Sequence, residues 1–335
     1  MSFVYQNNNS GSKLLLTVAA SACALLIMLA GCGQNANDEK VASEKQRAIR
    51  RVDQFQAVAS NEKIAVVVGG RVVVVSDLQS GSVVRIVLPS MSALIDVVHC
   101  ADGSFAALDF YRRIWVANSE AKVWTPRELK GTWRPLALTC DTQNRLWVVG
   151  SGTTLASSVD KGASWQLRDF KQDAMFNTVQ FVDANNGFIT GEFGAVYRTL
   201  DSGVSWNAEA KIPNEFYPYA AVFISATEGY VSGLAGVMLQ TKDAGKNWVK
   251  LENPSGLPQF GLTRRGGVVY SVGIGGSLQR LENQRWQSID YGVATPAYLR
   301  AVTPIGADRL LVAGAAGVMR IISLNSIKST IAKEE

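Results

Sequence analysis

Short apolar stretches separated by glycine-rich turns recur along most of the chain. Over residues 176–206 they predict four strands, at Phe176–Phe181, Gly187–Thr190 and Ala195–Thr199 and from Trp206 onward. The stretches are rich in Val, Ile, Phe and Tyr and are broken by glycine, a composition that favours strands over the helices of a solenoid with a similar period. This four-strand unit is the basis of the fold prediction.

The unit recurs at a nearly constant spacing. Anchored on a glycine, or its counterpart, ten residues before an acidic turn position, it is found seven times, at Gly69, Asp109, Gly150, Gly191, Gly233, Gly273 and Gly314. The successive spacings are 40, 41, 41, 42, 40 and 41 residues. A period near 40 is typical of a propeller blade, and a closed ring removes exposed sheet edges. We therefore predict an all-β fold, a seven-bladed β-propeller over residues 53–335.

The pattern is least regular where the ring must close. The last unit contains three predicted strands followed by IISLNSIKST. Either residues Arg47–Phe55 pair into this blade or residues Leu324–Thr330 complete it, and the sequence leaves both possibilities open.

An acidic box, Ser/Thr-x-Asp-x-Gly-x-x-Trp, follows the anchor in three successive units. In such a box the Asp accepts hydrogen bonds from turn amides, the Gly supplies a positive φ, and the Trp fills the wedge between blades. We interpret these residues as scaffold and not as a catalytic site. They are Asp160, Gly162 and Trp165, then Asp201, Gly203 and Trp206, then Asp243, Gly245 and Trp248.

The box and its anchor also resemble a known family. The pattern G-x-x-G-x-x-x-x-T-x-D-x-G-x-x-W from Gly191 to Trp206 is similar to that of the photosystem II stability/assembly factor family of Asp-box (BNR) propellers. The likeness covers about residues 53–330. It implies a non-enzymatic disc, without cofactor or metal, that holds a protein while a membrane complex is assembled.

Two alternatives to an assembly factor stay open at this point. Sialidases and other glycoside hydrolases also carry Asp boxes, but their catalytic domains have six blades and usually open with an Arg-Ile-Pro type motif that is missing here. The other alternative is an accessory lipoprotein of an envelope transporter. We assign no catalytic residue.

The N-terminal sequence is typical of an export signal. Residues 14–30 form an apolar run after Lys13, and the following Leu29-Ala30-Gly31-Cys32 resembles the lipobox of bacterial lipoproteins. We predict a signal peptide over residues 1–31, a lipid on Cys32 and a flexible tether over residues 32–52. The alternative is an uncleaved membrane anchor.

The residue after the lipobox cysteine indicates where the protein is localised. Gly33 favours the periplasmic side of the outer membrane by resemblance to bacterial sorting rules, or the thylakoid lumen in a cyanobacterium. In every case we expect the body to lie in the cell envelope.

The charge and histidine content argue against several classes of partner and active site. The 33 Lys and Arg nearly balance the 28 Asp and Glu, for a net charge of +5, so the total charge calls for no nucleic-acid partner. His99 is the single histidine, which argues against a histidine-rich metal site or a Ser/His relay. We expect a monomer whose partner is another protein, a membrane protein or its exported segment.

Propeller geometry predicts where that partner docks. If the strands of a blade are lettered A to D, the starts of strands A and the B–C turns share one face. Arginine with exposed aromatic residues is typical of interface hot spots, so this face is the candidate site for an acidic or carboxylate-bearing segment. The alternative is that the arginines are solvated and the aromatic residues pack between blades. The candidates are Arg71, Arg112, Arg113, Arg134, Arg300, Tyr217 and Tyr219, with Phe110, Tyr111, Phe193 and Phe216 beside them.

Two cysteines occupy matching places in neighbouring units. Cys100 and Cys140 lie 40 residues apart, just after the predicted strand A of each blade. An exported protein permits a disulfide between them, but equivalent positions on adjacent blades can be too far apart. The sequence does not decide.

Overall fold

The computed structural model describes residues 35–89, 92–292 and 297–325. Its chain divides into two units, residues 1–47 and 48–335. Helix α2 (Asn35–Gln46) lies in the first unit, within the stretch predicted as a tether, and the role of that stretch stays a prediction. The predicted signal peptide and Cys32 fall outside the described residues. Within the described ranges no helix is both long enough and apolar enough to span a membrane.

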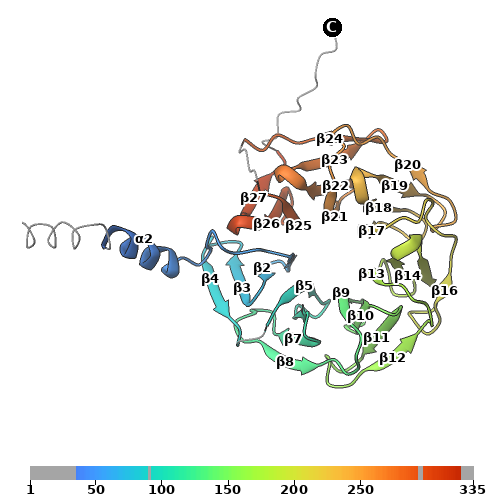
Figure 1. Ribbon diagram of the computed structural model, residues 1–335, viewed down its shortest axis with the longest axis horizontal. Helices are drawn as coiled ribbons and strands as arrows, with labels where there is room; N and C mark the ends of the chain where they lie inside the picture. The colour runs from blue at the N-terminus through green and yellow to red at the C-terminus, as the bar shows by residue number, and fades with distance from the viewer. Residues whose placement is uncertain (1–34, 90–91, 293–296, 326–335) are drawn as a thin grey trace, which may run out of the picture. The chain divides into compact units, whose positions relative to one another are not determined.

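The second unit is a ring of seven antiparallel sheets (Figure 1). The first three sheets contain β1 (Ala57–Ser60), β2 (Ile64–Gly69), β3 (Val72–Asp77) and β4 (Val83–Val87); β5 (Leu94–His99), β6 (Phe105–Asp109), β7 (Arg113–Ala117) and β8 (Thr125–Glu128); and β9 (Pro135–Cys140), β10 (Leu146–Gly150), β11 (Thr154–Ser158) and β12 (Gln166–Asp169). The fourth and fifth contain β13 (Phe176–Phe181), β14 (Gly187–Gly191), β15 (Val196–Thr199) and β16 (Asn207–Ala208); and β17 (Pro218–Phe223), β18 (Gly229–Gly233), β19 (Met238–Thr241) and β20 (Val249–Lys250). The last two contain β21 (Gln259–Arg265), β22 (Val268–Gly273), β23 (Leu278–Glu282) and β24 (Arg285–Ser288); and β25 (Leu299–Ile305), β26 (Arg309–Gly314) and β27 (Met319–Ser323). The predicted seven-bladed propeller is confirmed.

Burial follows the order of strands within each blade. In Figure 1 the first strand of each sheet lies nearest the centre and the last strand lies at the rim. Strands β6, β10, β14 and β18 are buried over their whole length, whereas β8 and β12 are exposed over theirs. This explains why the second stretch of each unit is the most apolar in sequence. In the fourth blade the predicted strands match the observed ones to within one residue.

The core lies between neighbouring blades. One cluster joins Trp147 of the third blade to Ile189 and Trp206 of the fourth, and the two indole rings meet edge to face with centroids 6.1 Å apart. A propeller blade is therefore stable only beside its neighbours, because each apolar face is covered by the next sheet.

The ring closes through the chain that precedes β1. Phe55 is fully buried against the seventh blade, and its backbone N–H donates to the carbonyl of Gly314 at 3.1 Å. Gly317 in turn donates its backbone N–H to the carbonyl of Asp53 at 2.8 Å. Of the two predicted closures, these bonds favour the segment Arg47–Phe55, although it adds no fourth strand, and the seventh sheet has three strands in the described part of the chain. Most of Leu324–Thr330 lies outside the described residues.

Side chains reinforce this closure. Arg85 on β4 forms a bidentate ion pair with Asp53, with N–O distances of 2.8 and 2.9 Å, and it also donates to the carbonyl of Ala48. The pair is almost completely buried. The segment before β1 is thus fixed to the first and the last blade at once.

A disulfide joins the second blade to the third. Cys100, just after β5, and Cys140, at the end of β9, are bonded with a Cα–Cα distance of 5.2 Å. The inner strands of a propeller converge near the axis, which brings these equivalent positions within the range of a disulfide.

Candidate docking site on one face of the propeller

The Asp boxes form local hydrogen-bonded turns. Asp160 accepts hydrogen bonds from the backbone N–H of Ser164 at 2.8 Å and from the hydroxyls of Ser164 and Ser158, which together lower its pKa to about 2. Gly162 has a φ of 85°, and its carbonyl accepts from the indole N–H of Trp165 at 3.1 Å. The Asp160 carboxylate and the Trp165 indole thus bond within the turn, and Lys161 pairs with Asp102 of the preceding blade at 2.6 Å, which is the geometry of a scaffold.

The other two boxes repeat the geometry of the Asp and the Gly. The third also repeats the indole bond, from Trp248 to the carbonyl of Gly245, whereas within the described residues the indole N–H of Trp206 has no hydrogen-bond partner. Asp201 accepts from the backbone N–H of Ser205 and Asp243 from that of Asn247, each at 2.8 Å. Gly203 and Gly245 have φ values of 84° and 92°. Trp206 is buried and Trp248 is half-buried, each within an apolar cluster.

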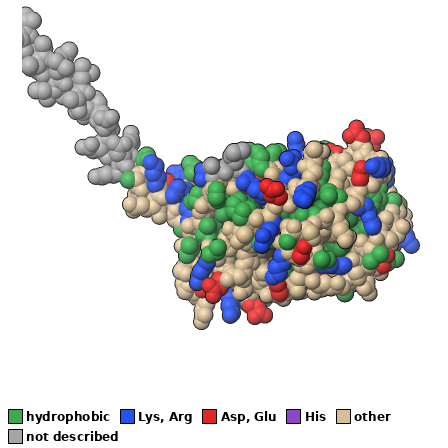
Figure 2. Space-filling model, turned by 90° about the horizontal axis from the view of Figure 1, so that it is seen from below, with side chains coloured by type: hydrophobic (Ala, Val, Ile, Leu, Met, Phe, Trp, Pro, Cys, Tyr) green, Lys and Arg blue, Asp and Glu red, His purple; other side chains and the backbone are tan. Residues whose placement is uncertain are grey.

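Charged side chains do not gather into one field on the side seen in Figure 2, where Lys and Arg are interspersed with Asp and Glu. A binding site must therefore be sought in local shape and chemistry. Figure 2 looks at the rim of the ring, whereas the face on which the predicted docking residues lie contains a hollow of about 810 Å³.

We call this hollow the docking pocket. It is built from the B–C turns of the second, third and fourth blades and from the two links that join these blades. The lining residues are Phe110, Tyr111, Arg112, Thr132, Trp133, Arg134, Ser151, Gly152, Asp173, Ala174, Met175, Glu192 and Phe193.

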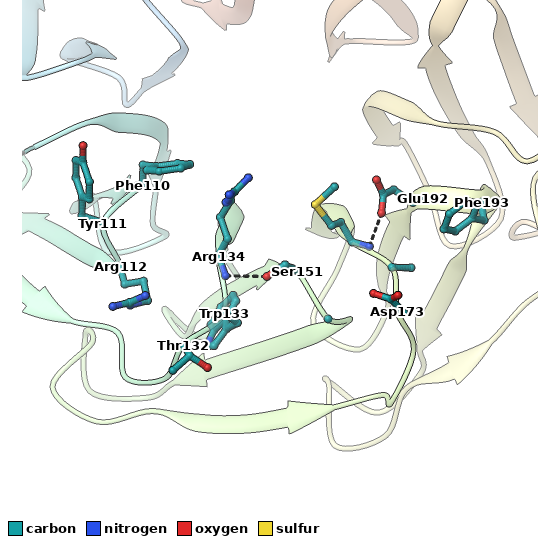
Figure 3. Close-up of a pocket in the computed structure, with 13 residues that line it drawn as sticks. Phe110, Tyr111, Arg112, Thr132, Trp133, Arg134, Ser151, Asp173, Glu192 and Phe193 are labelled. Carbon is teal, nitrogen blue, oxygen red and sulfur yellow. Dashed lines mark hydrogen bonds between the residues drawn. The ribbon is translucent and has the colours of Figure 1, made fainter.

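Arg134 stands in the middle of the docking pocket (Figure 3). Its backbone N–H donates to the hydroxyl of Ser151 at 2.8 Å, which fixes the start of β9. Its guanidinium lies 5.2 Å from the centre of the Phe110 ring. Within the described residues its side chain makes no hydrogen bond or ion pair, so its donors are available to a partner.

Aromatic side chains frame this arginine. Phe110, Tyr111 and Phe193 are 40%, 52% and 51% exposed, which is unusual for residues of this size. Phe193 sits in the turn η1 (Glu192–Gly194) with a φ of 56°, a conformation that holds the ring outward at a cost in backbone energy. Exposed rings beside an unpaired arginine are the composition of an interface hot spot.

The docking pocket also contains two acidic residues. Glu192 accepts a hydrogen bond from the backbone N–H of Met175 at 2.8 Å, which ties the third-to-fourth link to the turn η1. Asp173 is exposed in that link. The pocket therefore presents a cation at its centre and acids along one side.

The structure separates the other predicted docking residues. Arg71 is exposed, but its guanidinium donates to the carbonyl of Leu88 at 3.1 Å. Arg113 pairs with the fully buried Asp109 at 3.0 Å and stacks on Trp115, so its charge is compensated inside the second blade.

Three more candidates lie elsewhere on this face. Arg300 and Tyr219 line the central channel, and Tyr217 packs edge to face against Tyr219. Phe216 is buried between blades. Only Arg112 and Arg134 of the predicted arginines come together in the docking pocket.

About half of the residues that line the docking pocket could not be predicted from the sequence. Trp133, Asp173 and Met175 belong to the links between blades, whose sequences follow no repeat. The only indication in the sequence was Trp133, an aromatic residue directly before the predicted docking residue Arg134.

The ring and its boxes define a seven-bladed Asp-box β-propeller. Residues 163–261 match the family described as "Photosynthesis system II assembly factor YCF48", from the Asp-box turn of the third blade into β21. The predicted resemblance to this family is thereby confirmed over that segment. No curated protein sequence matches the chain.

Solved structures show the same fold. YCF48 from Cyanidioschyzon merolae is similar with a TM-score of 0.66 at 14% identity, covering 82% of this chain and 97% of that one. A structure described as YCF48 bound to D1 peptide has a TM-score of 0.67 at 12% identity, with coverages of 82% and 95%. Virginiamycin B lyase from Staphylococcus aureus reaches 0.71 at 12% identity, with coverages of 82% and 97%. The fold is thus shared by an assembly factor and by an enzyme.

Proposed function

We propose that this protein is a non-enzymatic, protein-binding propeller that is tethered to a membrane and acts as an assembly or scaffold factor for a membrane protein complex. The observation that carries the proposal is Arg134, unpaired within the described residues and framed by exposed aromatic rings in an open pocket. An extended protein segment with an acidic group fits such a pocket, because the carboxylate pairs with the guanidinium while apolar side chains cover the rings.

Two comparisons support a protein partner. The matched family is described as an assembly factor, and a YCF48 structure of the same fold is described as bound to D1 peptide. By analogy, the partner of this chain is a membrane protein or its exported segment. The seven blades differ from the six of the sialidase-like alternative, which favours the binding function.

The docking pocket is tested by charge reversal. We predict that Arg112→Glu combined with Arg134→Glu lowers recovery of the partner by at least tenfold when the full-length protein captures it from host membranes, because like charges replace an ion pair. Recovery is measured by quantitative mass spectrometry against Arg320→Glu, a reversal at an exposed position on β27 outside the pocket. Equal recovery with both variants would show that partners dock elsewhere.

The membrane tether is tested separately at Cys32. If the thiol carries lipid, Cys32→Ala moves the protein from the membrane fraction to the soluble fraction and abolishes labelling by radioactive palmitate. Labelling that persists in the variant would contradict the lipobox interpretation.

A further inference from the structure

The axis of the propeller contains a second cavity, of about 240 Å³, between the first strands of the seven sheets. None of its residues lines the docking pocket. It is smaller than the cavities that hold drug-sized ligands, so it fits only a small molecule or the end of a chain.

Arg300 is the cation of this cavity. It projects from β25, and its guanidinium lies 5.6 Å from the centre of the Phe260 ring. Burial lowers its pKa, although Asp96, Tyr298 and Tyr219 oppose that effect. Arg300 is half-buried, and within the described residues its side chain has neither a hydrogen bond nor an ion pair, so its five donors are available to a ligand in the cavity.

Across the ring lies an unsatisfied acceptor. Asn177 projects from β13, three blades away, and its Oδ1 atom is buried without a hydrogen-bond partner. Tyr219 and Phe260 of the intervening blades meet edge to face with centroids 5.3 Å apart. Half of the wall is therefore an aromatic surface with a cation at one end and an acceptor at the other.

The remaining half of the wall is mostly apolar, with two polar residues, Gln56 and Asp96. Val58, Ile95 and Leu136 come from the first three blades. Asp96 lies beside them, but its two carboxylate oxygens accept backbone N–H bonds from Val97 and Leu138, each at 2.8 Å. It forms no ion pair with Arg300, although its charge acts to raise the pKa of that guanidinium, so the Arg300 donors are not taken up by hydrogen bonds to Asp96.

We propose that the channel binds a small carboxylate that carries an N–H donor and an apolar side chain, as an N-acyl amino acid does. The carboxylate pairs with Arg300, the N–H donates to Asn177, and the apolar side chain lies against Ile95 and Leu136. The last residue of a protein chain has the same chemistry. The inference stands apart from the proposed function, because it uses no residue of the docking pocket.

The test titrates the full-length protein in detergent with N-acetyl-L-leucine by isothermal calorimetry. We expect saturable binding, at least tenfold weaker for N-acetyl-L-leucinamide, which lacks the carboxylate. Arg300→Gln should weaken binding of the acid at least tenfold and Asn177→Leu about fivefold. Arg320→Gln, an exposed arginine on β27 of the same blade, is the matched control and should leave the affinity unchanged.

A second titration separates the two sources of the ligand. A pentapeptide ending in leucine with a free carboxylate should bind at least tenfold more tightly than N-acetyl-L-leucine if the channel takes chain ends, and equally if it takes free small molecules. Both results support a carboxylate site. Equal binding of N-acetyl-L-leucine and N-acetyl-L-leucinamide by the unmodified protein would overturn the proposal, as would full affinity for the acid in Arg300→Gln. The comparison of acid with amide does not depend on the folding of a variant.

Discussion

At the scale of single residues, the buried carboxyl group of Asp96 makes the stability of the fold depend on pH. Burial raises its pKa from 3.8 to about 6, against the opposing effect of hydrogen bonds from Leu138 and Val97 and of the charge of Arg300. The folded protein then holds this proton more tightly than the unfolded chain does. Its contribution to stability is full below pH 3.8 and is lost as pH rises through 6.

We therefore predict that the free energy of unfolding of Asp96→Asn, relative to that of the unmodified protein, is about 3 kcal/mol higher at pH 7 than at pH 4. The free energy of unfolding in urea at both pH values measures it. Asp160→Asn is the control: the pKa of Asp160 is lowered to about 2, so its effect should be the same at both pH values. A constant difference for Asp96→Asn would contradict the buried-acid assignment.

At the scale of elements, the disulfide constrains two adjacent inner strands. It closes a loop with a sequence separation of 40 residues between β5 and β9. Replacing both Cys100 and Cys140 with Ala should lower the free energy of unfolding by about 4 kcal/mol, chiefly because the unfolded chain regains the entropy of an open loop. Urea unfolding with and without a reductant checks this, since reduction should destabilise the unmodified protein but leave the double variant unchanged.

At the scale of the whole molecule, ring closure depends on the buried pair of Asp53 and Arg85. Asp53→Ala leaves a buried guanidinium without its anion and should cost about 3 to 5 kcal/mol. Hydrogen exchange should then quicken first in β1 and in β25 to β27, the strands on both sides of the closure. The exposed pair of Asp169 and Lys171 provides the control, because Asp169→Ala should cost less than about 1 kcal/mol. Uniform exchange in all blades of Asp53→Ala would show that closure does not depend on this pair.

The fold could be predicted almost completely from sequence. Each blade repeats one local pattern, and the strand alternation, the positive-φ glycine and the tryptophan of an Asp box recur at a fixed spacing, as Gly203 and Trp206 illustrate. A seven-fold repeat averages out local ambiguity, so even the strand ends of the fourth blade can be predicted to within one residue.

The sites depend on contacts that no repeat encodes. Arg113 and Arg134 are both predicted docking residues, yet Arg113 pairs with Asp109, whereas the side chain of Arg134 makes no ion pair within the described residues. Arg300 and Asn177 meet one cavity although 123 residues separate them in the chain. The sequence by itself determined the ring, because its strands and turns are local. Only the tertiary structure decided which charges are paired, because pairing depends on the distance between blades.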